Sequence, residues 1–150
     1  MRASQVPKIF PTDDWLLAEA TSGGNPLIIR MRSTLPSRPN QTLFRHLVII
    51  KWAYEPNERG MPASSEHKRM NMFEDALEAG TELRQAAVQA ASLTGGGEKE
   101  WRYYTHDVDA FMASLNADLA GHGQYPLQIE SFQDADWSAL RDLQGESRDA

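Results

Sequence analysis

The histidines are the first candidates for chemistry in this sequence, because imidazole can bind metals or transfer protons near neutral pH. The chain has four of them: His46, His67, His106 and His122. None has the H-x-H or H-E-x-x-H spacing of a local metal site, so we expect no bound metal and no other cofactor. His106 is followed by Asp107 where a predicted strand leads into a predicted helix, and Glu100 precedes it. A polar cluster at a helix cap is the favoured interpretation; a small hydrolase or isomerase that uses these residues as acid and base is the alternative.

A row of carboxylates is the second candidate. Glu74, Glu78 and Glu82 stand four residues apart, which places them on one face of a predicted helix. Like charges at this spacing destabilise a helix by roughly 0.2–0.5 kcal/mol per pair, and no basic residue lies on that face to relieve them. The favoured interpretation is a solvated helix surface. The alternative is a docking surface for a basic partner, or for Arg30 and Arg32 of a second copy of the chain.

Two other motifs have structural interpretations. Thr94-Gly95-Gly96-Gly97 lacks the lysine of a phosphate-binding loop and joins two predicted strands, so it is typical of a hairpin turn. Trp52 and Tyr54 share one face of a predicted strand, and Trp101 and Tyr103 share a face of another. Aromatic residues on two such strands stack RNA bases in some modules, but the glycine and basic pattern of those modules is missing here. We therefore expect these aromatic side chains in the core or at a subunit interface.

The elements that position these residues follow from periodicity and turn signals. Strand patterns separated by turn residues predict a hairpin at the start of the chain, and the apolar run from Leu47 to Tyr54 predicts a central strand. Ser64 or Ser65 is expected to cap the first long helix, and Asp107 the second. The full set of predicted segments is 14–20, 27–34, 43–54, 87–93, 99–105 and 127–132 as strands, a loop around 36–40, helices after 64 and 107, and a short helix after Asp134 or Asp136.

From residue 43 onward this order is strand, helix, strand, strand, helix, strand, which predicts an α+β fold of ferredoxin-like βαββαβ topology. The opening hairpin would extend the antiparallel sheet. Both long helices have one apolar face, so we expect both to cover the same side of the sheet, with the other side open or covered by the short helix or another subunit. We expect one domain over residues 1–150, with a core from about 13 to 143 and loosely ordered segments at 1–10 and 145–150.

Composition narrows the classes of function. The chain has 150 residues, no cysteine, and 15 basic against 21 acidic side chains, for a net charge of −6. This acidic balance disfavours nucleic-acid binding, and the absence of cysteine excludes disulfides, thiol nucleophiles and iron–sulfur clusters. No apolar run approaches the roughly 18 residues of a membrane span. We therefore expect a cytoplasmic protein without nucleic-acid or membrane partners.

Several short motifs together resemble a known family. They are Asp14-Trp15, Gly60-Met61-Pro62, Glu74-Asp75 with Leu77, Thr94 with Gly97, and the segment from Glu100 to Asp107. Their order and spacing over roughly residues 13–137 resemble an uncharacterised bacterial family, domain of unknown function 695. The Gly-Met-Pro turn and the order of elements are also distantly similar to the B-type regulators of ribonuclease E activity. That likeness implies a small acidic protein that binds and restrains a ribonuclease.

These observations favour a non-catalytic protein-binding or regulatory module. A ribonuclease-restraining regulator and a small enzyme are the two alternatives. We expect a protein partner or a homodimer, bound through a helix-free side of the sheet that contains six residues, Arg30, Arg32, Trp52, Tyr54, Trp101 and Tyr103, or through the acidic helix face of Glu74, Glu78 and Glu82.

Overall fold

The computed structural model describes residues 9–149 and contains six strands and four helices. The strands are β1 (Trp15–Ser22), β2 (Asn25–Arg32), β3 (His46–Ala53), β4 (Ala87–Gly95), β5 (Glu98–Thr105) and β6 (Leu127–Gln133). The helices are α1 (Arg38–Leu43), α2 (Ser64–Arg84), α3 (Val108–Asp118) and α4 (Ser138–Asp149). The segment 1–8, expected to be loosely ordered, lies outside the described residues, as does residue 150.

The six strands form one antiparallel sheet in the order β1-β2-β4-β5-β3-β6. The opening hairpin extends the sheet beside β4, as expected. β3 lies between β5 and β6, so the apolar run forms a strand with partners on both sides, as predicted, but it lies next to the edge strand β6 and not at the centre of the six-stranded sheet. The α+β class is confirmed as well. A ferredoxin-like sheet has four strands, whereas this sheet has six and its strand order as a whole differs. Assignment to the ferredoxin-like topology therefore stays a prediction.

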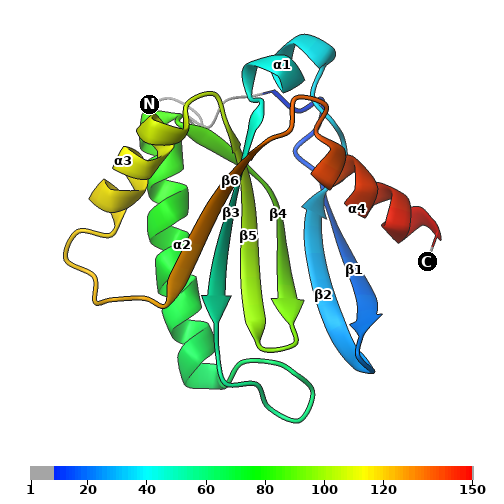
Figure 1. Cartoon of the computed structure of the whole chain (residues 1–150), viewed down its shortest axis with the longest axis vertical. Helices are drawn as coiled ribbons and strands as arrows, with labels where there is room; N and C mark the ends of the chain where they lie inside the picture. Colours follow the sequence, from blue (N-terminus) through cyan, green and yellow to red (C-terminus); the bar gives the residue numbers. More distant parts are fainter. Residues whose placement is uncertain (1–8, 150) are drawn as a thin grey trace.

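The helices α2 and α3 pack on the same face of the sheet, as their apolar faces predict (Figure 1). Their side chains Phe73, Leu77 and Phe111 meet the inward-facing residues of β3 and β5 in one core cluster. The strands and Tyr54, which directly follows β3, contribute these members of the cluster: Val48, Ile50, Trp52, Tyr54, Ala87, Trp101 and Tyr103.

The opposite face of the sheet is partly covered by α4, which lies beside the β1–β2 hairpin (Figure 1). Trp137, Leu140 and Leu143 of this segment form a second core cluster with side chains of β2, β3, β4 and β5. Phe10 packs edge-on against Trp137, with ring centroids 5.7 Å apart. Residue 10 thus contacts the domain, and α4 extends to Asp149; the expected loose order of the two ends of the chain stays a prediction.

Two local predictions differ from the structure. The segment expected to be a loop contains α1, which Ser37 caps by accepting a hydrogen bond from the amide of Asn40. The helix α2 has Ala63 at its N-cap position and no side-chain cap, so neither Ser64 nor Ser65 has the expected role.

Within residues 9–149, no helix has both the length and the apolar composition that a bilayer span requires.

Candidate functional site

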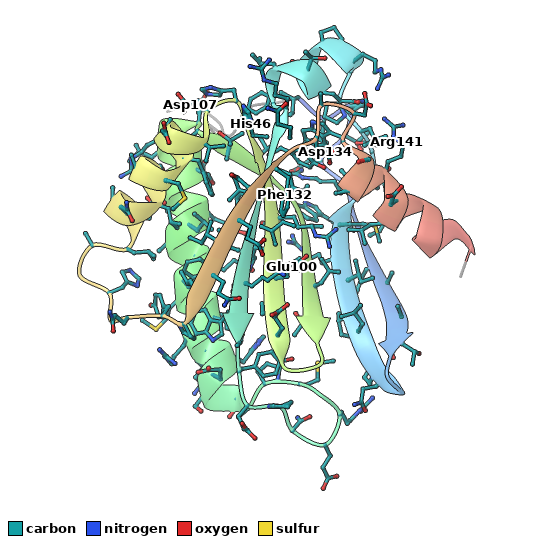
Figure 2. The ribbon with its side chains drawn as sticks, in the orientation of Figure 1. His46, Glu100, Asp107, Phe132, Asp134 and Arg141 are labelled. Atoms are coloured by element: carbon teal, nitrogen blue, oxygen red, sulfur yellow. The ribbon has the colours of Figure 1, made fainter. Side chains whose placement is uncertain are left out.

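A shallow cavity of about 370 Å³ lies where α1 and α4 meet. Its walls are Arg38 and Gln41 of α1, Arg141 of α4, and Asp136 of the turn before α4. These residues come from segments about 100 positions apart in the chain. Figure 2 shows Arg141 and neighbouring Asp134 together at one end of the sheet.

Gln41 fixes the geometry of this cavity. Its side chain is 3% exposed, and its Nε2 donates to the Pro36 carbonyl at 2.8 Å. This bond determines which way the amide group points, so Oε1 is turned toward the two guanidinium groups. Oε1 accepts from Nη1 of Arg38 at 3.3 Å and from Nη2 of Arg141 at 3.4 Å. One buried neutral oxygen thus holds two positive charges close together.

Asp136 supplies the remaining polar contacts. Its carboxylate lies 3.4 Å from Nη1 of Arg38, and its main-chain carbonyl accepts from Nη2 of Arg141 at 3.0 Å. The side chains of Arg38 and Asp136 are 71% and 78% exposed, so this ion pair is screened by water and contributes little to stability. The four side chains carry two positive charges and one negative charge.

Trp137 holds the two walls of the cavity together. Its indole Nε1 donates to the carbonyls of Phe44 at 3.0 Å and Gln41 at 3.3 Å, which fixes the end of α1. Its ring stacks on Tyr104, with centroids 3.7 Å apart and an interplanar angle of 8°. The backbone of Trp137 is left-handed, with φ of 55°. For a bulky residue this conformation costs about 1–3 kcal/mol, and the buried contacts of the indole offset that cost.

Asp134 connects Tyr104 to the start of α4. Its carboxylate accepts from the Tyr104 hydroxyl at 2.6 Å and from the amides of Ser138 at 2.9 Å and Ala139 at 3.1 Å. Burial acts to raise the pKa of Asp134, but these hydrogen bonds outweigh it and hold the pKa below its ordinary value. Burial, followed by the hydrogen bond to Asp134 and then its negative charge, raises the pKa of Tyr104, so its hydroxyl stays protonated and donates.

This arrangement is suited to binding an anion. Each guanidinium has five N–H donors, and the contacts among the described residues use Nη1 of Arg38 and Nη2 of Arg141. The remaining donors are available to a carboxylate or a phosphate, which arginine binds in a planar, two-pronged geometry. An anion would also reduce the repulsion between the two guanidinium groups. Neither arginine was among the expected site residues.

The four aromatic residues lie in the core, one of the two places expected for them, and do not form part of a helix-free binding surface. Trp52, Trp101 and Tyr103 are fully buried and Tyr54 is 8% exposed. These side chains share one face of the sheet, as the strand period predicts. However, α2 and α3 pack on that same face, because burying these large apolar groups stabilises the fold. The expected exposed aromatic surface is therefore wrong.

Arg30 and Arg32 lie on the face of β2 that points to the same side of the sheet as α2 and α3, and both contact Trp15. The guanidinium carbon of Arg30 lies 3.8 Å from the Trp15 ring centroid, and that of Arg32 lies 4.4 Å from it. Arg32 is buried, pairs with Asp13, and donates through Nε to the Gln89 carbonyl at 3.1 Å. Arg32 thus has a structural role, whereas Arg30 is half-buried.

The carboxylates on the acidic face of α2 have different surroundings within the chain. Glu74 accepts from the indole Nε1 of Trp101 at 2.6 Å, an interaction that the sequence does not predict. Burial and the nearby charge of Glu74 raise the pKa of Glu78, while Arg30 acts in the opposite direction. Glu82 is exposed. Glu74, the first of the three carboxylates, is therefore less available to a basic partner than the sequence predicts.

The proposed acid–base trio does not converge. Asp107 caps α3 by accepting from the amide of Ala110 at 3.1 Å, as expected. Glu100 pairs with Arg102 on the opposite face of the sheet from α3, at 2.6 Å. His106 is exposed and its ring contacts Phe44. Six positions along a strand span roughly 20 Å, so Glu100 is out of reach of His106; Figure 2 shows Glu100 mid-sheet and Asp107 at its end.

The sequence did contain a signal for part of the arginine cavity. Ser37 is a preferred N-cap residue, and Pro39 follows it within the first helical turn, where proline is well tolerated. This pattern indicates a helix that would place Arg38 and Gln41 three residues apart on one side. Nothing in the local sequence indicates that Arg141 lies opposite them.

Among residues 9–149, no group of three or more histidine or acidic side chains is arranged to hold a metal ion.

Comparison with protein families identifies the group to which the chain belongs. The model of a family of unknown function, DUF695, matches residues 13–143. The chain is a member of the DUF695 family. This result confirms the resemblance drawn from the short motifs, whereas bacterial origin and the likeness to the ribonuclease regulators stay predictions. Neither the curated proteins nor the solved structures include a match to the chain.

Proposed function

We propose that this DUF695 domain is a non-catalytic binding module that recognises a carboxylate-bearing segment of a partner protein through Arg38 and Arg141. The observation that carries the proposal is the contact of both guanidinium groups with the single Oε1 atom of Gln41. Two positive charges in this position repel each other, and a carboxylate placed between them would remove that repulsion.

The surroundings favour a protein segment over a buried small molecule. The cavity is shallow, and Arg38 is largely exposed, so a ligand bound there remains in contact with solvent. Phe132 is 45% exposed on the same face of the sheet as α4 and precedes Asp134 by two positions. Figure 2 shows Phe132 next to Asp134, toward the middle of the sheet. A segment with acidic and apolar residues could contact both features.

Isothermal titration of the whole chain with a hexaglutamate peptide, and separately with inorganic phosphate, tests the proposal. We expect the peptide to bind, and Arg38→Gln and Arg141→Gln each to weaken binding about 10- to 100-fold, the loss of one charged hydrogen bond or more. Arg59→Gln, in the loop between β3 and α2, is the matched control and should leave affinity unchanged. Binding of phosphate alone would identify a free-anion site, and equal loss in all three variants would contradict a role for the cavity.

A further inference from the structure

The edge strand β1 has the features of a pairing surface. It lies at one border of the sheet, with β2 as its only strand partner among the described residues. Leu17 is 76% exposed and Leu16 is 37% exposed. Natural sheets protect such edges with lysine, proline or inward-pointing charges; β1 has neither lysine nor proline, and its single charged residue, Glu19, is exposed.

The backbone geometry shows which groups are free. Ser22 and Asn25 flank a two-residue turn, so they form a hydrogen-bonded pair, and such pairs alternate along the antiparallel hairpin. Ala20 and Leu16 therefore bond inward to β2. Trp15, Leu17 and Glu19 occupy the alternate positions, so their N–H and C=O groups point outward from the sheet. Pro26, which has no N–H, stands opposite Thr21 in a non-bonded position, as this pattern requires.

We infer that two copies of the chain pair through β1 around a two-fold axis, so that their sheets join into one. A two-fold axis requires antiparallel pairing of β1 with itself. One register places Leu17 opposite Leu17 of the second copy. In this register the residues whose N–H and C=O groups point outward face each other along the whole pairing, and the two exposed leucines pack together.

Charge complementarity favours this register. It places Glu19 of the second copy opposite Trp15, on the same face of the sheet. The Trp15 ring is covered by the guanidinium groups of Arg30 and Arg32, at 3.8 and 4.4 Å. The carboxylate would therefore approach the positive charge of Arg30, since Arg32 is already paired with Asp13, and the two-fold axis repeats the contact. In the register with Glu19 opposite Glu19, the carboxylates would repel each other instead.

Sedimentation equilibrium of the whole chain between about 1 and 100 µM tests the inference. We expect a dimer, and we expect Leu17→Lys to raise its dissociation constant at least about tenfold by placing two ammonium groups side by side. Leu83→Lys is the matched control, because Leu83 is 72% exposed but lies on α2, and it should leave the dimer intact. A monomeric wild type, or equal weakening by both variants, would overturn the inference.

Hydrogen exchange distinguishes strand pairing from other modes of association. On dimerisation the amides of Leu17 and Glu19 should exchange more slowly, whereas the amides of Leu16 and Ala18, already bonded to β2, should change little. A dimer without this alternation would contradict pairing through β1. Because β1 is distant in sequence from both arginines of the cavity and the test uses no acidic ligand, its failure would leave the carboxylate proposal standing.

Discussion

Asp134 is the residue on which the geometry of the arginine cavity most depends. Its carboxylate receives the Tyr104 hydroxyl and the first amides of α4, the helix that carries Arg141. Tyr104 in turn stacks on Trp137, whose indole holds the end of α1. A chain of contacts thus runs from one carboxylate to both walls of the cavity.

Replacing this carboxylate should destabilise the fold. Asp134→Ala removes a helix cap and leaves the buried Tyr104 hydroxyl without its acceptor, so we expect a loss of about 2–3 kcal/mol in the free energy of unfolding. Denaturant unfolding measures the loss. Asp136→Ala, two positions further along at an exposed side chain, is the control and should change stability by less than about 0.5 kcal/mol. Equal effects of the two substitutions would contradict the role given to Asp134.

The same residue predicts a pH dependence. The folded-state pKa of Asp134 lies below the ordinary value of 3.8 that applies to the unfolded chain. A lowered pKa stabilises the fold above the unfolded value, and the contribution disappears as the pH falls through the folded value. The difference in stability between wild type and Asp134→Ala should therefore be constant from neutral pH to about pH 4 and should shrink below it. A difference that grows with acidification would contradict this assignment.

At the scale of elements, the contact between α2 and α3 depends on one glycine. A Cβ atom added to Gly80 would overlap the carboxylate of Asp118, whose side chain is 2% exposed and pairs with Arg84. Burial raises the pKa of Asp118, and the hydrogen bond from Arg84 opposes that shift. The buried carboxylate cannot move away without losing this partner.

Gly80→Ala is therefore expected to destabilise the protein by about 1–3 kcal/mol, although alanine is the better helix former. Gly145→Ala in α4 is the matched control: among the described residues, no atom outside its own stretch of helix lies within 4 Å of the added Cβ, so it should stabilise by about 0.5–1 kcal/mol. Thermal unfolding of both variants decides the matter. An increase in stability for Gly80→Ala would show that α3 does not pack against this position.

Most of the elements were predictable because their signals are local. The apolar run of β3, the Asp107 cap and the glycine turn after Thr94 each depend on neighbouring residues, and each was predicted. α1 was missed although Ser37 and Pro39 indicate it. The prediction of a serine cap for α2 is wrong, because Ala63 occupies the N-cap position. No local rule distinguishes the serine that caps α1 from the serines that do not cap α2.

At the scale of the whole molecule, the most consequential wrong prediction is that the aromatic face of the sheet is free of helices. Alternation shows that Trp52 and Trp101 lie on the same side as their strand neighbours two positions away, but it does not show which side α2 and α3 cover. The cavity could not be predicted for a related reason, because Arg38 and Arg141 meet only through the placement of α4 on the opposite face.

Carboxylate binding by the arginine cavity is tested most directly by an NMR titration that follows the side-chain Nε–Hε signals of the arginines in the whole chain as hexaglutamate peptide is added. If Arg38 and Arg141 bind the carboxylates, saturable shifts appear at these two residues, are absent at Arg59, and are lost in Gln41→Ala, which removes the shared acceptor. Uniform small shifts at all arginines, or shifts unaffected by Gln41→Ala, would contradict this mode of binding.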